Sequence, residues 1–176
     1  MSPATNPKRP RRPRLTGVDR TGLREVCLAS GLRWQVLAVA DAEPSGQVVA
    51  LPSHIAHGSG RDWDLLGWHV IDHGSWNPDT DTLELELHPG GRKKVRLHNP
   101  GLVAEVMTER VQASIVFQRY LEVPDTHSGL TVSARRNLAD QTLSWQAVPG
   151  RGLRWNDPDV QAFADAAVRR LRREFG

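Results

Sequence analysis

Short segments of alternating apolar and polar residues, each ended by a turn signal, restrict the fold of this chain more than any other feature. Residues 83–87 place three leucines alternately with two glutamates, and residues 93–98 place Val95 and Leu97 between basic residues. A period of two is typical of a strand with one buried face. Pro89-Gly90-Gly91 lies between the two segments and is typical of a turn. We therefore predict antiparallel strands, with cross-strand ion pairs from Glu86 to Lys94 or Arg96.

Further segments with strand-like composition follow the same logic. Residues 34–40 and 47–51 are predicted as a hairpin, because 43–46 has turn chemistry, and 65–75 as a third strand. Three later segments separated by short links predict an antiparallel meander, and they cover residues 115–123, 130–135 and 143–147.

Helical spacing occurs at three places. The first is a short helix from Asp19 to a glycine stop at Gly31, and Gly22 weakens it. The last begins at Asp157 and Pro158, a good N-cap followed by a good first helical residue, and continues with an apolar stripe to Phe175.

The middle segment, residues 101–121, leaves two alternatives open. A helix over 102–112 followed by a strand fits the change of period near Ile115. A continuous helix also fits, since Val103, Met107, Val111 and Ile115 lie four residues apart.

These segments predict a mainly β (α+β) fold. We expect a small sandwich or open barrel of about seven to eight antiparallel strands, with four or five in the first sheet, closed by the C-terminal amphipathic helix and preceded by a short N-terminal helix. Residues 19–176 would form one domain. Residues 1–18 are proline-rich with little to bury, so a disordered arm is expected there.

The order of these elements resembles the pleckstrin-homology-like (PH-like) superfold. More narrowly, residues from Leu23 to Phe175 resemble small actinobacterial proteins that join an N-terminal helix to this body. Packing patterns carry the resemblance: residues 33–38 (RWQVLA), 67–71 (GWHVI) with Trp76, 109–116 (ERVQASIV), 135–136 (RR) and 143–145 (LSW). The resemblance brings no activity with it, but it implies a platform for protein binding. Lipid-binding members hold inositol phosphates with basic residues between the first two strands, whereas residues 41–46 here are acidic, which argues against phosphoinositides.

Positive charge is concentrated at the N-terminus. Residues 1–25 contain seven basic and two acidic residues, a net +5, while the remainder is −2, although the whole chain carries only +3. An extended basic arm could follow the phosphates of a nucleic acid or another polyanion, and its cations are Lys8, Arg9, Arg11, Arg12 and Arg14. No aromatic residue is interleaved to stack on bases, so a solubilising tail is the competing interpretation.

Catalytic signals are few. Four histidines, His54, His57, His69 and His73, fall within twenty residues and could hold zinc or nickel if they converged, although no HExxH motif or cysteine ligand accompanies them. The single cysteine, Cys27, fits helix packing, and no nucleophile elbow, P-loop or GxGxxG motif occurs. We predict no cofactor and no resident metal.

Tryptophan supplies the last candidates. Trp34, Trp68, Trp76 and Trp145 fall on predicted strands and should pack in the core, whereas Trp63 and Trp155 fall in predicted loops, where they could anchor a partner. No run of about 20 apolar residues predicts a membrane span. Our first hypothesis is therefore a non-enzymatic interaction or adaptor domain in the cytoplasm, with a partner on a sheet edge or in the groove beside the last helix. Polyanion tethering by the arm is the alternative, and a His-based metal enzyme is the third hypothesis.

Overall fold

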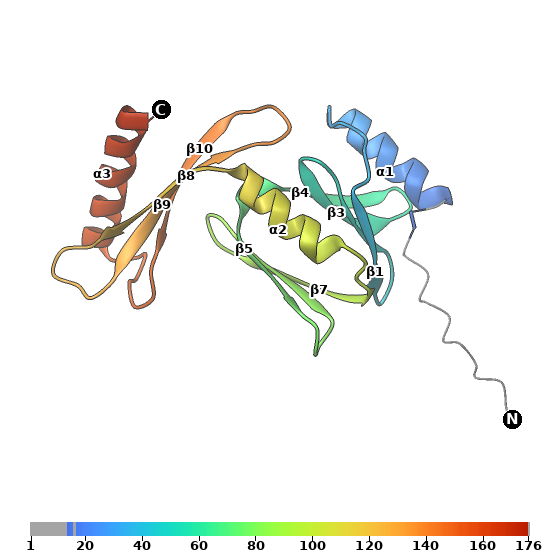
Figure 1. The fold of residues 1–176 in the computed structure, drawn as a ribbon, viewed down its shortest axis with the longest axis horizontal. Coiled ribbons are helices and arrows are strands. Elements are labelled where there is room, and N and C mark those ends of the chain that lie inside the picture. Colours follow the sequence, from blue (N-terminus) through green and yellow to red (C-terminus); the bar gives the residue numbers. More distant parts are fainter. Residues whose placement is uncertain (1–13, 16, 176) are drawn as a thin grey trace, which may run out of the picture.

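The computed structural model describes residues 14–15 and 17–175 of the chain. Helices and strands follow one another along the chain in this order (Figure 1): α1 Gly17–Ala29, β1 Ala38–Glu43, β2 Gln47–Ala50, β3 His54–Ser59, β4 Asp62–Gly67, a 3-10 turn η1 Trp68–Val70, β5 Ile71–Asn77, β6 Thr82–Leu87, β7 Arg92–Asn99, α2 Val103–Ser114, β8 Ile115–Glu122, β9 Gly129–Arg136, β10 Leu143–Pro149 and α3 Pro158–Phe175.

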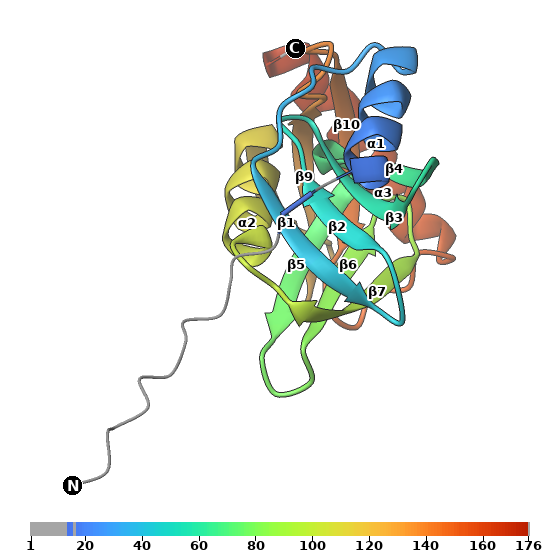
Figure 2. The same cartoon turned by 90° about the vertical axis from the view of Figure 1, so that its right-hand side faces the viewer.

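The larger sheet has seven antiparallel strands and curls into a half-barrel around α2. Its strand order is β4-β3-β2-β1-β7-β6-β5. The inward residues of these strands and the buried face of α2, with Val103, Met107 and Val111, form one core cluster. The outer face of the same sheet is covered by α1 on the side of β3 and β4 (Figure 2). The sheet is thus covered on both sides where it is most apolar.

The first helix begins at Gly17, and Leu15 before it is buried with Leu23 and Cys27. Packing of Cys27 in the helix agrees with the sequence prediction, and burial raises the pKa of its thiol. Disorder was predicted for residues 1–18, but Leu15 is buried and α1 begins at Gly17, so the end of this arm is ordered. Residues 1–13 and 16 lie outside the described residues.

Gly22, which weakens the helix by propensity, allows α1 to lie against the β3–β4 turn. A β-carbon at this position would be 1.7 Å from the Gly60 carbonyl oxygen. The Gly60 N–H in turn donates to Asp19 Oδ1 at 2.6 Å, which fastens the start of the helix to the same turn.

We expect Gly22→Ala to lower the free energy of unfolding by about 1–3 kcal/mol, because the added methyl group overpacks this contact. Helix propensity alone predicts the opposite, a gain of roughly 1 kcal/mol. Urea denaturation measures the difference, with the exposed Thr21→Ala as the control for propensity on the same helix. A Gly22→Ala protein more stable than the wild type would contradict the packing argument.

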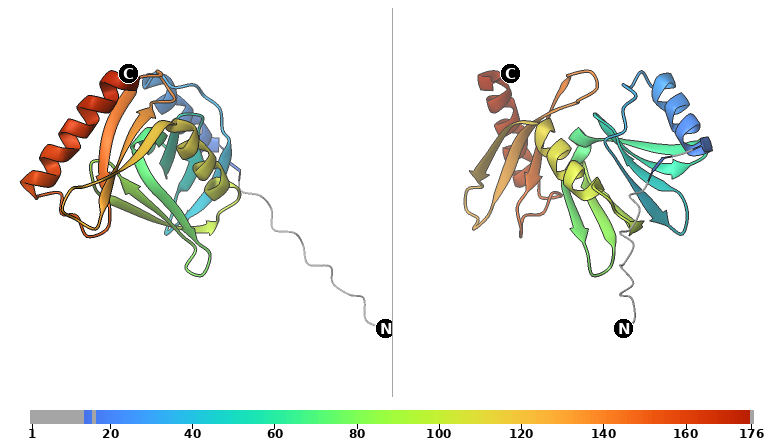
Figure 3. Two further views of the ribbon diagram at one scale, coloured as in Figure 1. Left: turned by 60° about the vertical axis from the view of Figure 1, so that its left-hand side comes forward. Right: turned by 45° about the vertical axis from the view of Figure 1, so that its right-hand side comes forward.

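The smaller sheet has three strands in the order β10-β9-β8, and α3 covers one of its faces (Figure 3). Asp157 caps α3 as predicted, since its Oδ1 accepts a hydrogen bond from the Asp159 N–H at 3.0 Å. The apolar stripe of α3 packs on Leu130 and Val132 of the central strand. The predicted meander and C-terminal helix are both confirmed.

Several predictions about the larger sheet were wrong. The described residues form ten strands rather than seven to eight, because a β3–β4 hairpin was missed and residues 65–75 divide into the end of β4, η1 and β5. The C-terminal helix does not close the larger sheet, whose inner face is filled by α2. Residues 101–121 form a helix and then a strand.

The predicted ion pairs between β6 and β7 form two residues away from the expected register. Glu86 pairs with Arg92 and Glu84 with Lys94, both at 2.6 Å, while Arg96 reaches Glu43 on β1. All are exposed enough that each contributes only tenths of a kcal/mol. No helix in the described ranges is long and apolar enough to cross a membrane.

Candidate functional site

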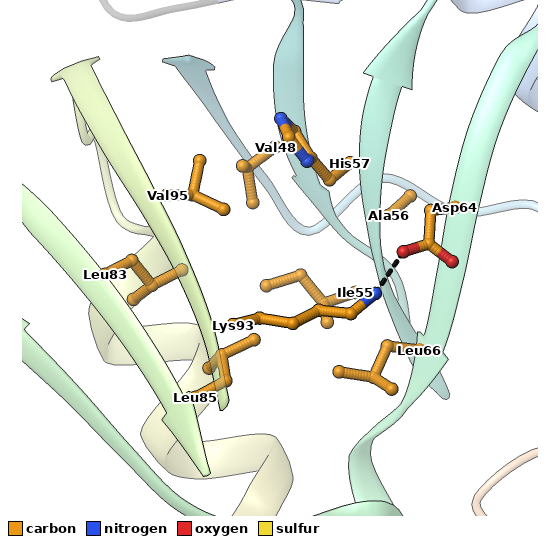
Figure 4. A pocket seen from close by; sticks show the side chains of 10 residues that line it. All are labelled: Val48, Ile55, Ala56, His57, Asp64, Leu66, Leu83, Leu85, Lys93 and Val95. Atoms are coloured by element: carbon orange, nitrogen blue, oxygen red, sulfur yellow. Dashed lines mark hydrogen bonds and ion pairs between the residues drawn. The ribbon is translucent and has the colours of Figure 1, made fainter. Parts of the chain in front are cut away.

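Side chains close the open end of the half-barrel, where a ligand could otherwise enter. Lys93 extends from β7 across the concave face to an ion pair with Asp64 on β4 (Figure 4). The cavity beneath is lined mainly by apolar residues such as Ile55, Leu66 and Leu85, and it has a volume of about 30 Å³. That is room for about two water molecules. This cavity is therefore too small for an organic ligand.

The four candidate histidines do not converge. His54 and His69 lie near each other around Gly67, and burial, first of all, lowers the pKa of both. His57 lies at the mouth of the half-barrel and His73 is exposed on β5. Across residues 14–15 and 17–175 no group of three or more His, Cys, Asp or Glu side chains could hold a metal ion. The convergence that a metal site requires is missing in this part of the chain.

The two tryptophans predicted as partner anchors lie in different environments. Trp63 is on β4 rather than in a loop, is 8% exposed, and donates its Nε1–H to the Gly60 carbonyl at 2.9 Å. It packs in the cluster beneath α1, so its predicted place in a loop was wrong and its side chain is not accessible as a partner anchor. Trp155 is 44% exposed in the turn before α3 and is accessible to a partner.

The basic arm cannot be placed in the same way. Arg14 is exposed, and Lys8, Arg9, Arg11 and Arg12 lie outside the described residues. The predicted polyanion site remains a prediction from sequence.

A polar junction that the sequence did not indicate joins the two sheets. Arg135 of β9 is 2% exposed and donates to the carbonyl oxygens of Ile71 and Val111, in β5 and α2 respectively. In the same direction, from the smaller sheet to the larger, Gln146 Nε2 of β10 donates a hydrogen bond to Asp72 Oδ1 of β5 at 2.6 Å. The junction is thus held by hydrogen bonds that side chains of the smaller sheet donate to the larger sheet and α2.

Asp72 lies at the centre of this junction, and its negative charge is poorly compensated by neighbouring groups. The pairing of β5 with β6 shifts register between Ile71 and His73, a bulge that re-aims the intervening side chain. Burial raises the pKa of Asp72 above its usual range, although His88, Arg135 and Gln146 all act to lower it. The imidazole nitrogen His88 Nδ1 lies 3.7 Å from the carboxylate and forms an ion pair with it only when protonated. Desolvation therefore outweighs the favourable neighbours.

A groove runs beside α3 where the helix leaves part of the edge strand β8 uncovered, while at the end of the helix Phe175 stacks on Phe117 of β8 with the ring centroids 4.7 Å apart. The helix packs mainly over β9 and β10, which leaves a step between itself and β8. Leu121 and Glu122 form one wall of this step and Phe163, Ala166, Ala167 and Arg170 the other, enclosing about 330 Å³. We call this the β8–α3 groove.

Two arginines stand along the β8–α3 groove. Arg119 lies opposite Val132, so it is on the α3 side of β8 between Phe117 and Leu121. Arg170 lines the groove from the helix. Both are exposed, and no ion pair within the described ranges includes either of them.

The sequence predicted a partner either on a sheet edge or in the groove beside the last helix. The β8–α3 groove is a place of this kind, its residues could not be named from sequence, and partner binding there stays a prediction. Comparison with known proteins does not identify a function for this groove, because no protein-family model, no curated protein and no solved structure matches the chain.

Proposed function

We propose that this protein is a non-enzymatic interaction module that binds an extended segment of a partner protein along β8. The observation that carries the proposal is the coincidence of a free strand edge with an apolar groove. In the described part of the chain β8 pairs only with β9, so its outer edge has unpaired backbone donors and acceptors. An added strand satisfies such an edge, and pockets beside it select side chains.

The outer edge of β8 lacks the usual protection against strand addition. Natural edge strands are blocked by proline, lysine, bulges or a covering element. Here the single register shift lies between Ile115 and Phe117, which leaves residues 117–122 as a regular edge of about 20 Å. Tyr120 is 58% exposed on this edge, and no proline interrupts it.

The groove and its charges define the chemistry of the partner. A large apolar side chain fits between Leu121 and Phe163, whereas the unpaired Arg119 and Arg170 favour carboxylates next to it. The partner is therefore an extended acidic segment with one apolar anchor. Trp155, exposed before α3, remains a candidate contact.

The resemblance to the PH-like superfold supports this proposal, because members of that superfold commonly serve as protein-binding platforms. A cytoplasmic setting is proposed with it, from the single cysteine. Both stay predictions from the sequence.

The test is selection of peptides from a random displayed library, followed by affinity measurement on variants. Ala166→Trp fills the groove from an exposed position, and we expect it to weaken binding at least tenfold, about 1.4 kcal/mol. Gln161→Trp, exposed on another side of α3, should change nothing. Arg170→Glu reverses the charge beside the groove and should also weaken binding. Arg172→Glu is its control.

Two results would overturn the proposal. One is that the selected peptides bind Ala166→Trp as tightly as the wild type, which would place them elsewhere on the surface. The other is that the selected sequences show no enrichment of acidic residues around an apolar one.

A further inference from the structure

A second cavity lies on the opposite face of β8, between the two sheets, and it is unrelated to the β8–α3 groove. It is bounded by β5, by the last turns of α2 and by the beginning of β8, three segments that meet where the chain passes from the larger to the smaller sheet (Figure 1). Its volume is about 310 Å³, roughly ten times that of the cavity inside the half-barrel. We call it the inter-sheet cleft.

The walls of the inter-sheet cleft differ in character. Met107, Val111 and Ile115 supply apolar surface from the helix and the start of the strand. Gln112, Gln118 and Asp72 supply polar groups. Among the described residues that line the cleft, Asp72 is the one acidic side chain, and His73 lines the cleft beside it. The cleft thus combines apolar side chains with convergent polar groups, as small-molecule sites do, and polar groups make up the larger part of its exposed lining.

Asp72 retains the capacity to bind a donor from the cleft. A carboxylate has about four lone-pair sites. Gln146 occupies one of them, on Oδ1, and the closest approach to Oδ2 is His88 Nδ1 at 3.7 Å, longer than a hydrogen bond. Because Arg135 donates to backbone carbonyls, its guanidinium is committed to the junction rather than to this carboxylate.

Burial raises the pKa of Asp72 in spite of its favourable neighbours, so the ionised form lacks stabilisation that water would give it. A cation that enters the cleft supplies that stabilisation, whereas an anion meets the single negative charge. The apolar walls add burial for a compact hydrocarbon body.

We propose that the inter-sheet cleft binds a small organic cation, an amidine, guanidine or amine with a compact apolar body, through Asp72. A planar amidinium is the best match, because its paired N–H groups suit the geometry of a carboxylate. The apolar body lies against Val111 and Ile115, and the amides of Gln112 and Gln118 are placed to contact its polar end.

Benzamidine is the probe, and the isosteric but neutral benzamide is its comparison. Titration of each into the isotopically labelled full chain, followed by amide NMR, should show saturable shifts around residues 72–74 and 107–118 for benzamidine. Benzamide should bind at least about tenfold more weakly. Asp72→Asn keeps the acceptor for Gln146 but removes the charge, and it should weaken benzamidine about tenfold or more while leaving benzamide unchanged.

Two further variants separate loss of the site from loss of the fold. Asp62→Asn removes an exposed carboxylate from β4 and should leave benzamidine affinity unchanged. Gln112→Trp closes the exposed lip of the cleft without touching Asp72 and should abolish the shifts, with a dispersed spectrum as proof of folding. The proposal fails if benzamidine does not saturate the wild type by about 10 mM, if benzamide binds equally well, or if Asp72→Asn binds as tightly as the wild type. Peptide binding at the β8–α3 groove is unaffected by any of these results.

Discussion

Arg135→Met is expected to lower the free energy of unfolding by about 3–5 kcal/mol, the usual cost of removing one partner from a buried charged network. Methionine preserves the length and much of the volume of the side chain, so the loss reports on the guanidinium. Without it, the carbonyls of Ile71 and Val111 lose a buried donor, and Asp72 loses a cation that favours its ionised form. Urea denaturation followed by circular dichroism measures the effect.

Coupling between Arg135 and Asp72 gives the control for this prediction. In an Arg135→Met/Asp72→Asn double variant the buried carboxylate charge is gone, so the combined cost should be smaller than the sum of the two single costs. Arg136→Met, at the neighbouring, partly exposed position, should change stability by less than about 1 kcal/mol. A loss below about 1 kcal/mol for Arg135→Met, or strict additivity in the double variant, would show that the junction does not depend on this cation.

The role of Arg135 explains why the junction could not be predicted from sequence. In β9, Leu130, Val132 and Ala134 alternate with Thr131, Ser133 and Arg135, which predicts a strand with one apolar and one polar face. The apolar row packs on α3 as expected. The polar row is also buried at Ser133 and Arg135, because that face meets the larger sheet. Alternation distinguishes the two faces of a strand, but it does not reveal what covers the polar one.

Strands with clear alternation and closed by turns were predicted well, and β6, β7, β9 and β10 all lie where the pattern placed them. The β3–β4 hairpin was missed because its sequence, residues 54–67, mixes histidine, glycine and aspartate with few apolar residues. Gly58 explains part of this composition, since a β-carbon there would lie 2.0 Å from the Asp62 carbonyl oxygen. The close approach that forms the hairpin therefore requires a residue that sequence rules assign to loops.

The β8–α3 groove was predicted in kind but not in detail. The sequence indicates a three-strand meander followed by an amphipathic helix, and an edge strand beside that helix follows from the topology. The offset of α3 toward β9 and β10, which uncovers Leu121, is a property of packing. It depends on which small residues face the sheet, such as Ala164 and Ala167, and a helical stripe alone does not fix that lateral position.

Trp68→Ala is expected to cost about 3–5 kcal/mol of unfolding free energy, because it empties the largest fully buried side chain of the core. Trp68 begins η1, the short turn that replaces the predicted strand over residues 65–75. Its ring packs with the α2 cluster, and its Nε1–H donates to the Leu51 carbonyl at 3.0 Å. The side chain thus links the end of β4 to the loop between β2 and β3. Urea denaturation provides the measurement.

Trp68→Phe separates the two contributions to this stabilisation. Phenylalanine keeps most of the buried ring but cannot donate to Leu51, so a loss of about 1–3 kcal/mol is expected for the orphaned carbonyl together with the smaller side chain. Trp155→Ala, exposed in the turn before α3, is the matched control and should alter stability by no more than about 0.5 kcal/mol. If Trp68→Ala and Trp155→Ala cost the same, η1 is not the buried corner that turns the chain from β4 into β5, and the division of residues 65–75 into three elements loses its physical basis.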